Sequence, residues 1–318
     1  MELRQLRYFV TVVEEGGFTR AAARLHLAQP GLSAQIRQLE KELGQPLLDR
    51  SHRSVTLTET GRAVLPYARA ALAAADAVRE TADAYTGLLR GRVSLGLVSG
   101  ATGHAFDIAS FLADFHDAHP ALEIALTEDA SERMQAALLA GELDIALLGP
   151  TEEEPPPGLT FETVIDVPLA VVAAAGDPLF DRADPGAGVP LAELRDRALI
   201  CLPRGTGVRA ALERACGRVG FRPRVAFEAA APHVLAQLAA RGLGVAVLPG
   251  GEGGGGGGAG SAFDGPLRAL PIVRPGIRAR IALAWRSTGP ASPAARVLLD
   301  SLRGRLRAMS EGAGGPAH

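Results

Sequence analysis

One short stretch of the chain, QPGLSAQIRQLEKELG at residues 29–44, carries hydrogen-bonding side chains in a helical pattern. Pro30 near its start and Gly44 at its end are typical of helix boundaries. Its apolar residues recur every three or four positions and therefore share one face: Leu32, Ile36, Leu39 and Leu43. The other face is small and hydrogen-bonding at first and basic further on, with Pro30, Ser33, Ala34, Arg37, Gln38 and Lys41.

The polar face of this helix offers the chemistry that recognition of double-stranded DNA requires. A recognition helix meets base edges with its N-terminal end, which is where Gln29 and Ser33 lie. Arg37, one turn further on, can reach a base or a phosphate. The alternative is a solvated face on which two acids, Glu40 and Glu42, balance the basic residues.

The neighbouring segments complete a predicted winged helix-turn-helix domain over residues 1–57. Apolar residues mark one helix before Gly16 and a second, short helix before the sequence HLAQP. Two helices joined by a tight turn then follow a first packing helix. Alternation at residues 55–57 predicts a short strand or ribbon, whose tip carries Arg50, His52 and Arg53. On this wing, Arg53 would meet phosphate or the minor groove.

Residues 58–90 predict one long, alanine-rich linker helix that Thr58 can cap. Its apolar residues recur at spacings of three and four and form a continuous seam. Because alanines let a second helix approach closely, we interpret this seam as a dimer contact. The residues we assign to it are Leu65, Leu72, Ala75 and Tyr85. The alternative is a helix that packs against its own domain.

From residue 91 onward, strand-like and helix-like runs alternate, which predicts an α/β domain with parallel strands and right-handed crossovers. The first runs are a strand at 93–98, a helix at 105–119, a strand at 122–127, a helix at 130–140 and a strand at 144–148. We expect two lobes, because the pattern then repeats, with crossings near Glu162 and Arg268. Their predicted ranges are 91–162 with 268–310 for lobe I and 163–267 for lobe II.

Two glycine-containing loops in this domain suit a small anionic ligand. The loops SGATG at 99–103 and PRGTGVR at 203–209 each follow a predicted strand and open a predicted helix. Free N–H groups at two helix N-termini that face one cleft would form an anion site. Arg204 and Arg209 would add positive charge. The alternative is that both loops are ordinary turns.

The composition supports folded cores and excludes some classes of protein. The chain has 318 residues, 47% of them hydrophobic, and a net charge of −2. Residues 1–62 hold nine Lys or Arg against seven Asp or Glu, a weakly basic balance. The N-terminal stretch contains acids and does not read as a signal peptide. No apolar run reaches the roughly 18 residues of a membrane span, so we expect a cytoplasmic protein without a membrane partner. The run at 251–260 reads as a flexible glycine-rich surface loop.

The cysteines and histidines do not predict a metal or catalytic site. Cys201 and Cys216 form neither a disulfide framework nor a CxxC pair. A redox-sensing role for Cys201 stays an alternative to the interpretation of both as small buried apolar residues. No HExxH or GxSxG motif occurs, so we expect no metal, no cofactor and no enzymatic activity. An enzyme built on the α/β lobes and a transport-type solute-binding protein are rival classes, which the N-terminal helices disfavour.

Three motifs resemble one family of proteins. FTRAAARLHLAQPGLSAQIRQLEKELGQPLLDRSHRSVTLTETG closely resembles the DNA-binding domain of LysR-type transcriptional regulators. GELDIALLG and LAARGLGVAVLP resemble two signatures of that family's effector domain. The resemblance covers nearly the whole chain. It implies a winged helix-turn-helix, a dimerising linker helix and a two-lobed α/β domain similar to periplasmic binding proteins.

The resemblance also implies partners and sites. The partners are double-stranded promoter DNA, a small effector, which we expect to be anionic, and further copies of the chain as a homodimer or homotetramer; a contact with RNA polymerase stays open. The implied DNA contacts are Gln29, Pro30, Ser33, Ala34, Arg37 and Arg53. The implied effector contacts between the lobes are Ser99, Gly100, Thr102, Thr127, Pro203, Thr206 and Phe227.

Three departures from the family pattern affect these expectations. Ala28 stands where the family often has a serine that caps the recognition helix, and its absence costs about 1 kcal/mol. Ala34 stands where many members carry arginine, and alanine offers only apolar contact, for example to a thymine methyl group. The glycine run at 251–260 replaces a more complex segment. Base readout therefore rests more on Gln29, Pro30, Ser33 and Arg37.

Overall fold

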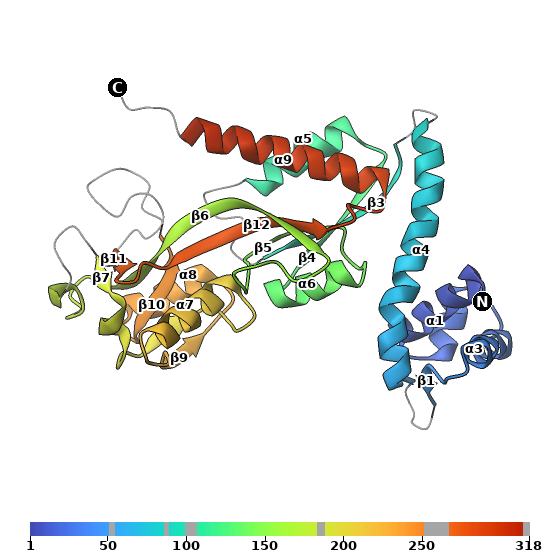
Figure 1. The fold of residues 1–318 in the computed structure, drawn as a ribbon, viewed down its shortest axis with the longest axis horizontal. Helices are drawn as coiled ribbons and strands as arrows, with labels where there is room; N and C mark the ends of the chain where they lie inside the picture. The colour runs from blue at the N-terminus through green and yellow to red at the C-terminus, as the bar shows by residue number, and fades with distance from the viewer. Residues whose placement is uncertain (51–54, 86–88, 99–106, 183–187, 251–266, 314–318) are drawn as a thin grey trace.

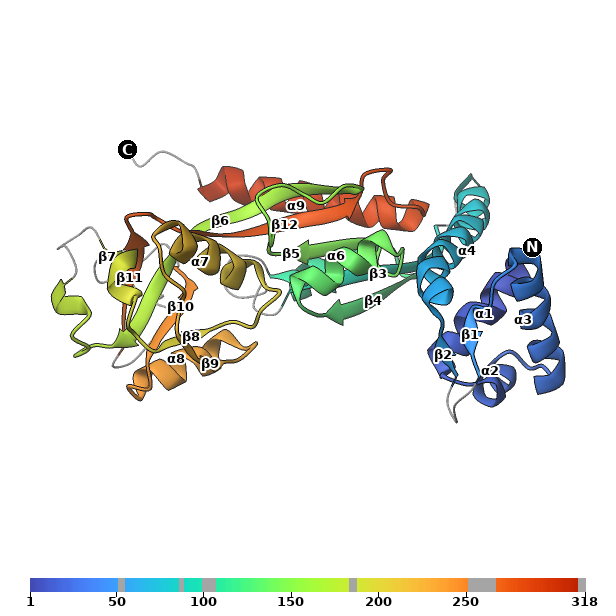
Figure 2. The same cartoon turned by 60° about the horizontal axis from the view of Figure 1, so that its bottom comes forward.

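The chain folds into a helical N-terminal domain, one long helix and an elongated α/β domain (Figure 1). The long helix, α4, stands between the other two parts in both views (Figures 1 and 2). The computed structural model describes residues 1–50, 55–85, 89–98, 107–182, 188–250 and 267–313. No helix in these ranges is long and apolar enough to cross a membrane.

The N-terminal domain has the predicted winged helix-turn-helix architecture. Its elements are α1 (Leu3–Glu15), α2 (Phe18–Arg24), α3 (Gln29–Leu43), β1 (Leu48–Asp49) and β2 (Thr56–Leu57), with β1 and β2 antiparallel. The apolar face of α3 is buried as predicted at Leu32, Ile36 and Leu39. Leu43 is an exception with 39% exposure, because α3 ends at once at Gly44 in the left-handed conformation. The wing tip at 51–54, with His52 and Arg53, lies outside the described residues.

The linker helix α4 (Glu59–Tyr85) begins as predicted, with the Thr58 hydroxyl accepting the Gly61 N–H at 2.9 Å. The partner of its apolar seam differs from the dimer contact that we interpreted from the sequence. Leu65 and Leu72 pack against the helix-turn-helix core of the same chain, because α1 lies alongside α4 and supplies apolar partners there. Ala75 is half-buried, and the side chain of Tyr85 lies outside the described part.

The first half of the α/β domain confirms the predicted parallel strands. Strand β3 pairs in parallel with both β4 and β5. The elements are β3 (Gly91–Leu97), α5 (Ile108–Ala118), β4 (Leu122–Glu128), α6 (Ser131–Leu139) and β5 (Ile145–Leu148). The final helix α9 (Pro293–Ala313) covers this half together with α5, around a shared apolar core.

Two long strands join the halves of the sheet through an antiparallel pairing that the sequence pattern did not reveal. Strand β6 (Leu159–Ala174) pairs with β12 (Arg278–Arg286) up to Pro168 and then with β10 (Val245–Pro249) and β11 (Leu267–Val273). The chain therefore crosses between lobes at Pro168 and again between β11 and β12, further along than the predicted Glu162 and Arg268. Because Pro168 and several polar residues interrupt the apolar pattern of β6, its first half did not read as a strand.

Lobe II is built on the second half of this sheet, with one helix on each face. Its core residues divide between a cluster under α7 and a cluster under α8. The overall strand order is β4-β3-β5-β12-β6-β10-β8-β9, with β11 beside β6 and β7 beside β11. The remaining elements are η1 (Phe180–Arg182), β7 (Val189–Pro190), η2 (Leu191–Leu194), β8 (Leu199–Cys201), α7 (Gly207–Arg218), β9 (Val225–Glu228) and α8 (Pro232–Ala240). The glycine run at 251–260 lies outside the described residues.

Candidate DNA-binding surface and effector-binding lobes

The polar face of α3 is accessible along its length. Gln29, Pro30, Ala34 and Arg37 are exposed and Ser33 is half-buried. Helix α3 lies on the side of the N-terminal domain that faces away from the α/β domain (Figure 2). The structure therefore places these five predicted DNA contacts on one open surface.

The start of α3 shows the expected missing cap. Ala28 occupies the N-cap position in an extended conformation, and no side chain there accepts a helical N–H. The backbone N–H of Gly31 instead bonds the Ala28 carbonyl at 3.0 Å. The start of the helix thus gains no side-chain capping energy.

Glu40 of α3 anchors the wing, a role that its position in the sequence did not reveal. Its carboxylate accepts the backbone N–H groups of Leu47 at 3.0 Å and Leu48 at 3.1 Å. It also pairs with Arg50 at 2.7 Å. The Glu40 carboxylate therefore holds β1 against α3 and does not neutralise the basic residues on the polar face of the helix.

The second acid, Glu42, is also engaged away from the basic residues. Its carboxylate pairs with the N-terminal amino group of the chain and accepts from Gln38 at 3.0 Å. These interactions hold the pKa of Glu42 below its usual value, with the amino group as the largest cause. In the described part of the chain, Arg37 and Lys41 form no ion pair. The interpretation as a balanced, solvated face is thereby weakened.

We expect Glu40→Ala to destabilise the N-terminal domain. The substitution leaves the N–H groups of Leu47 and Leu48 without their acceptor, at a cost of about 1–3 kcal/mol. Urea unfolding of the full chain, followed by circular dichroism, measures the loss. Glu42→Ala is the matched control on the same helix and should unfold like the wild type. Equal unfolding curves for both variants would contradict the anchoring role.

The first helix start proposed for an anion is occupied by a side chain of the protein itself. Helix α5 begins at Ile108 rather than near residue 105, and Asp107 caps it. The Asp107 carboxylate accepts the N–H of Ser110 at 3.0 Å and its hydroxyl at 2.6 Å. These bonds hold the pKa of Asp107 below its usual value. Three predicted effector contacts, Ser99, Gly100 and Thr102, lie outside the described residues.

The second helix start is occupied in the same way. The Thr206 hydroxyl accepts the backbone N–H of Arg209 at 3.4 Å and donates to the carbonyl of Pro203 at 2.7 Å. The Arg209 side chain is 5% exposed and pairs with Glu213 at 2.8 Å and Glu228 at 2.9 Å. Thr206 is thus a helix cap and the Arg209 charge is compensated by two acids, so neither side chain is free to bind an anion at this helix start.

Two predicted effector contacts remain accessible. Thr127 is exposed near the end of β4, and the ring of Phe227 on β9 is 39% exposed. Both lie near the carboxyl ends of parallel strands, where α/β folds bind their ligands. Pro203 is half-buried after β8.

The two lobes touch directly at the N-terminus of α6, a contact that the sequence motifs did not show. The Glu132 N–H donates to the carbonyl of Gly205 at 3.1 Å. The buried Ser131 hydroxyl accepts the N–H of Gly149 at 3.0 Å. A Cβ added to Gly207 would lie 2.6 Å from the carbonyl carbon of Gly149. Glycines at the end of GELDIALLG and at the start of α7 therefore permit this close approach.

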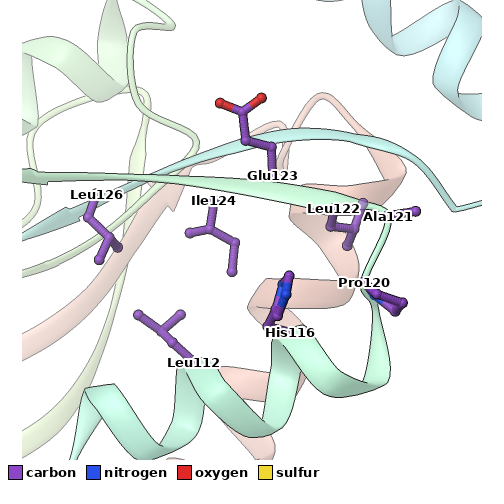
Figure 3. Close-up of a pocket in the computed structure, with 8 residues that line it drawn as sticks. All are labelled: Leu112, His116, Pro120, Ala121, Leu122, Glu123, Ile124 and Leu126. Atoms are coloured by element: carbon purple, nitrogen blue, oxygen red, sulfur yellow. The ribbon is translucent and has the colours of Figure 1, made fainter.

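A separate groove of about 520 Å³ lies between α5 and the edge strand β4. Figure 3 shows Leu112, Ile124 and Leu126 pointing into it, whereas the Glu123 carboxylate points to the other side of β4. His116 is the polar side chain within the groove. Such an apolar surface lacks the converging polar groups that orient a small ligand, and none of the predicted effector contacts lines it.

Comparison with known proteins decides the family. Residues 3–62 match the family described as bacterial regulatory helix-turn-helix proteins of the lysR family, and residues 86–307 match the LysR substrate binding domain. The chain belongs to the LysR family. It is a DNA-binding transcriptional regulator with a C-terminal effector-binding domain, which confirms the resemblance and the fold class derived from the motifs.

The LysR-family chain aligns with several relatives over almost its full length. It is 35% identical to the HTH-type transcriptional regulator ShiR of Corynebacterium glutamicum, over 90% of this chain and 92% of that protein. It is 28% identical to the dual regulator OxyR of Escherichia coli, over 96% of each chain. A full-length OxyR structure from Pseudomonas aeruginosa matches with a TM-score of 0.70 and 28% identity over 95% of each chain.

Similarity to OxyR draws attention to the cysteines of the LysR-family chain. Cys201 and Cys216 are free thiols, 1% and 0% exposed. Burial raises the pKa of Cys201 to about 12 and that of Cys216 to about 11. Because the thiolate is the reactive form, burial disfavours the reactive form of both cysteines in this structure. The geometry therefore favours the interpretation as buried apolar residues.

Proposed function

We propose that this chain regulates transcription by binding promoter DNA through α3 as a homodimer or a pair of homodimers, with a small effector bound between its lobes. The observation that carries the DNA proposal is the open polar face of α3. Its neighbouring acids are engaged elsewhere, which leaves Arg37 and Lys41 to face phosphates. The proposal assigns no catalytic step to the chain.

The exposed side of α4 supports a dimer better than the predicted seam does. Tyr67 is 77% exposed and Val78 is 70% exposed, and Ala63, Ala74 and Ala82 are also exposed on the same side. Their spacing along α4 places them in one apolar stripe. Large apolar side chains in such a stripe indicate a partner surface, so we assign the dimer contact to this stripe instead of Leu65 and Leu72.

For the effector, the proposal rests on the substrate-binding domain and on the strand ends at the lobe junction. Thr127 and Phe227 are the accessible contacts there, and the loop at 99–103 remains part of the proposal. An effector that contacts both lobes would bind one lobe arrangement more tightly than another. It could shift the population of the two arrangements only by that difference in affinity, and the α/β domain would pass the shift to the DNA-bound dimer.

Three substitutions on α3 test DNA recognition. We expect Gln29→Ala and Ser33→Ala to weaken binding to specific DNA by roughly 1–3 kcal/mol each and random DNA much less, because base contacts carry sequence information. Lys41→Ala should weaken both DNAs alike and make the dependence of log affinity on log salt shallower by about one unit. Fluorescence anisotropy with labelled DNA from beside the protein's own gene measures all three. Equal losses on both DNAs for Gln29→Ala and Ser33→Ala would exclude base readout by these residues.

A further inference from the structure

A second pocket, of about 300 Å³, lies at the lobe junction and has a different chemistry from the apolar groove. It is formed by three segments: the loop after β5 in lobe I, one face of α7 in lobe II, and the turn that leads into β12. Neither Thr127 nor Phe227 lines it. Its charged lining residues are Arg214, Arg218, Arg278, Arg280, Glu152 and Glu153.

The guanidinium groups in this pocket are incompletely compensated. Arg278 donates to the carboxylate of Asp166 at 2.7 Å, and Arg280 lies 3.5 Å from the same carboxylate. The single carboxylate of Asp166 is therefore shared by two arginines. Arg214 donates to a neutral acceptor, the carbonyl oxygen of Thr151. With four arginines and two glutamates in the lining, and one further acid behind it, positive charge is in excess.

Most of the arginine donors remain available for a ligand. A guanidinium carries five N–H groups, whereas Arg214 makes one hydrogen bond and Arg278 makes two within the described structure. The Arg218–Glu153 pair is exposed on both sides, at 66% and 63%. Exposed pairs of this kind contribute little stability, so an anion can replace Glu153 at small cost.

We infer that this arginine pocket binds a small dianion that carries phosphate or carboxylate groups. The planar guanidinium fork matches the oxygen geometry of both groups. Because the lining comes from both lobes and from the turn between β11 and β12, a bound dianion bridges them. It would therefore favour the lobe arrangement in which Arg214 and Arg280 face the same space. This site is additional to the proposed effector contacts at Thr127 and Phe227.

Isothermal titration of the full chain with inorganic pyrophosphate, and separately with succinate, tests the pocket at matched ionic strength. We expect one saturable site per chain for at least one of the two probes, and the stronger one identifies the phosphate or the dicarboxylate class. Arg214→Gln and Arg280→Gln should each weaken that binding at least tenfold. Arg280→Gln removes no hydrogen bond that the structure shows, so it keeps the test valid if Arg214→Gln fails to fold.

Two control variants separate this site from general charge and from the proposed effector contacts. Arg222→Gln removes an exposed arginine of lobe II outside the pocket and should bind the probe like the wild type. Phe227→Ala should also bind it unchanged, even if it abolishes the response to an effector at the strand ends. The inference would be overturned if no saturable binding is found. It would also be overturned if both pocket variants bind the probe with unchanged affinity, or if Arg222→Gln loses as much affinity as they do.

Discussion

Val78→Glu should convert the regulator into monomers that remain folded. Val78 is 70% exposed in the single chain, so a carboxylate there costs the monomer little. In a dimer joined through the stripe on α4, the same carboxylate would be buried against apolar surface without a partner. Losing the second DNA-binding domain removes the gain from two linked contacts, so affinity for a palindromic site should fall about 100-fold or more. Light scattering measures the mass, and anisotropy on full and half sites measures affinity.

Two comparison variants make this result specific to the stripe. Val78→Ile keeps the apolar surface and should stay oligomeric. Leu72→Glu places a charge against the helix-turn-helix core, so it should lower the unfolding midpoint of the N-terminal domain whatever the oligomeric state. If Val78→Glu stays fully oligomeric, or loses half-site affinity as well as palindrome affinity, the stripe is not the dimer contact.

The linker helix shows what periodicity can and cannot establish. The spacing of apolar residues predicted the helix and its start at Thr58, because both depend on local sequence. Periodicity does not determine whether the seam packs against a second copy of the chain or against the chain's own N-terminal domain. Leu65 and Leu72 turned out to have a partner in their own chain, and the exposed Tyr67 and Val78 became visible only once α1 was placed beside α4.

In the lobes, local sequence patterns were equally unable to show which partners the polar groups have. The motifs located the ends of β3 and β8, but they could not show which side chains fill the helix starts. Asp107 and Thr206 cap these helices themselves, and short polar residues are strongly preferred at this position. The antiparallel pairing of β6 with β12 was missed because it joins residues more than 100 positions apart, and no local pattern records such a register.

Gly207→Ala should disturb the contact between the lobes. The new methyl carbon would lie 2.6 Å from the backbone of Gly149, and backbone cannot rotate aside as a flexible side chain can. Overpacking of this kind typically costs about 1–3 kcal/mol. Because the two segments belong to different lobes, part of the strain should be relieved by separating them. The Glu132 N–H, which bonds the Gly205 carbonyl across this contact, should then exchange faster with solvent.

Gly217→Ala supplies the matched control on the same helix. An added Cβ at Gly217 meets nothing within 4 Å, so the substitution only improves helix propensity and should stabilise the chain by about 0.5–1 kcal/mol. Hydrogen exchange read by mass spectrometry, together with thermal unfolding, compares the two variants. Faster exchange around Glu132 in Gly207→Ala alone would support a lobe contact that depends on the missing side chain. If both variants exchange like the wild type, the approach of Gly149 to Gly207 does not hold the lobes together, and α6 is free to move independently of α7.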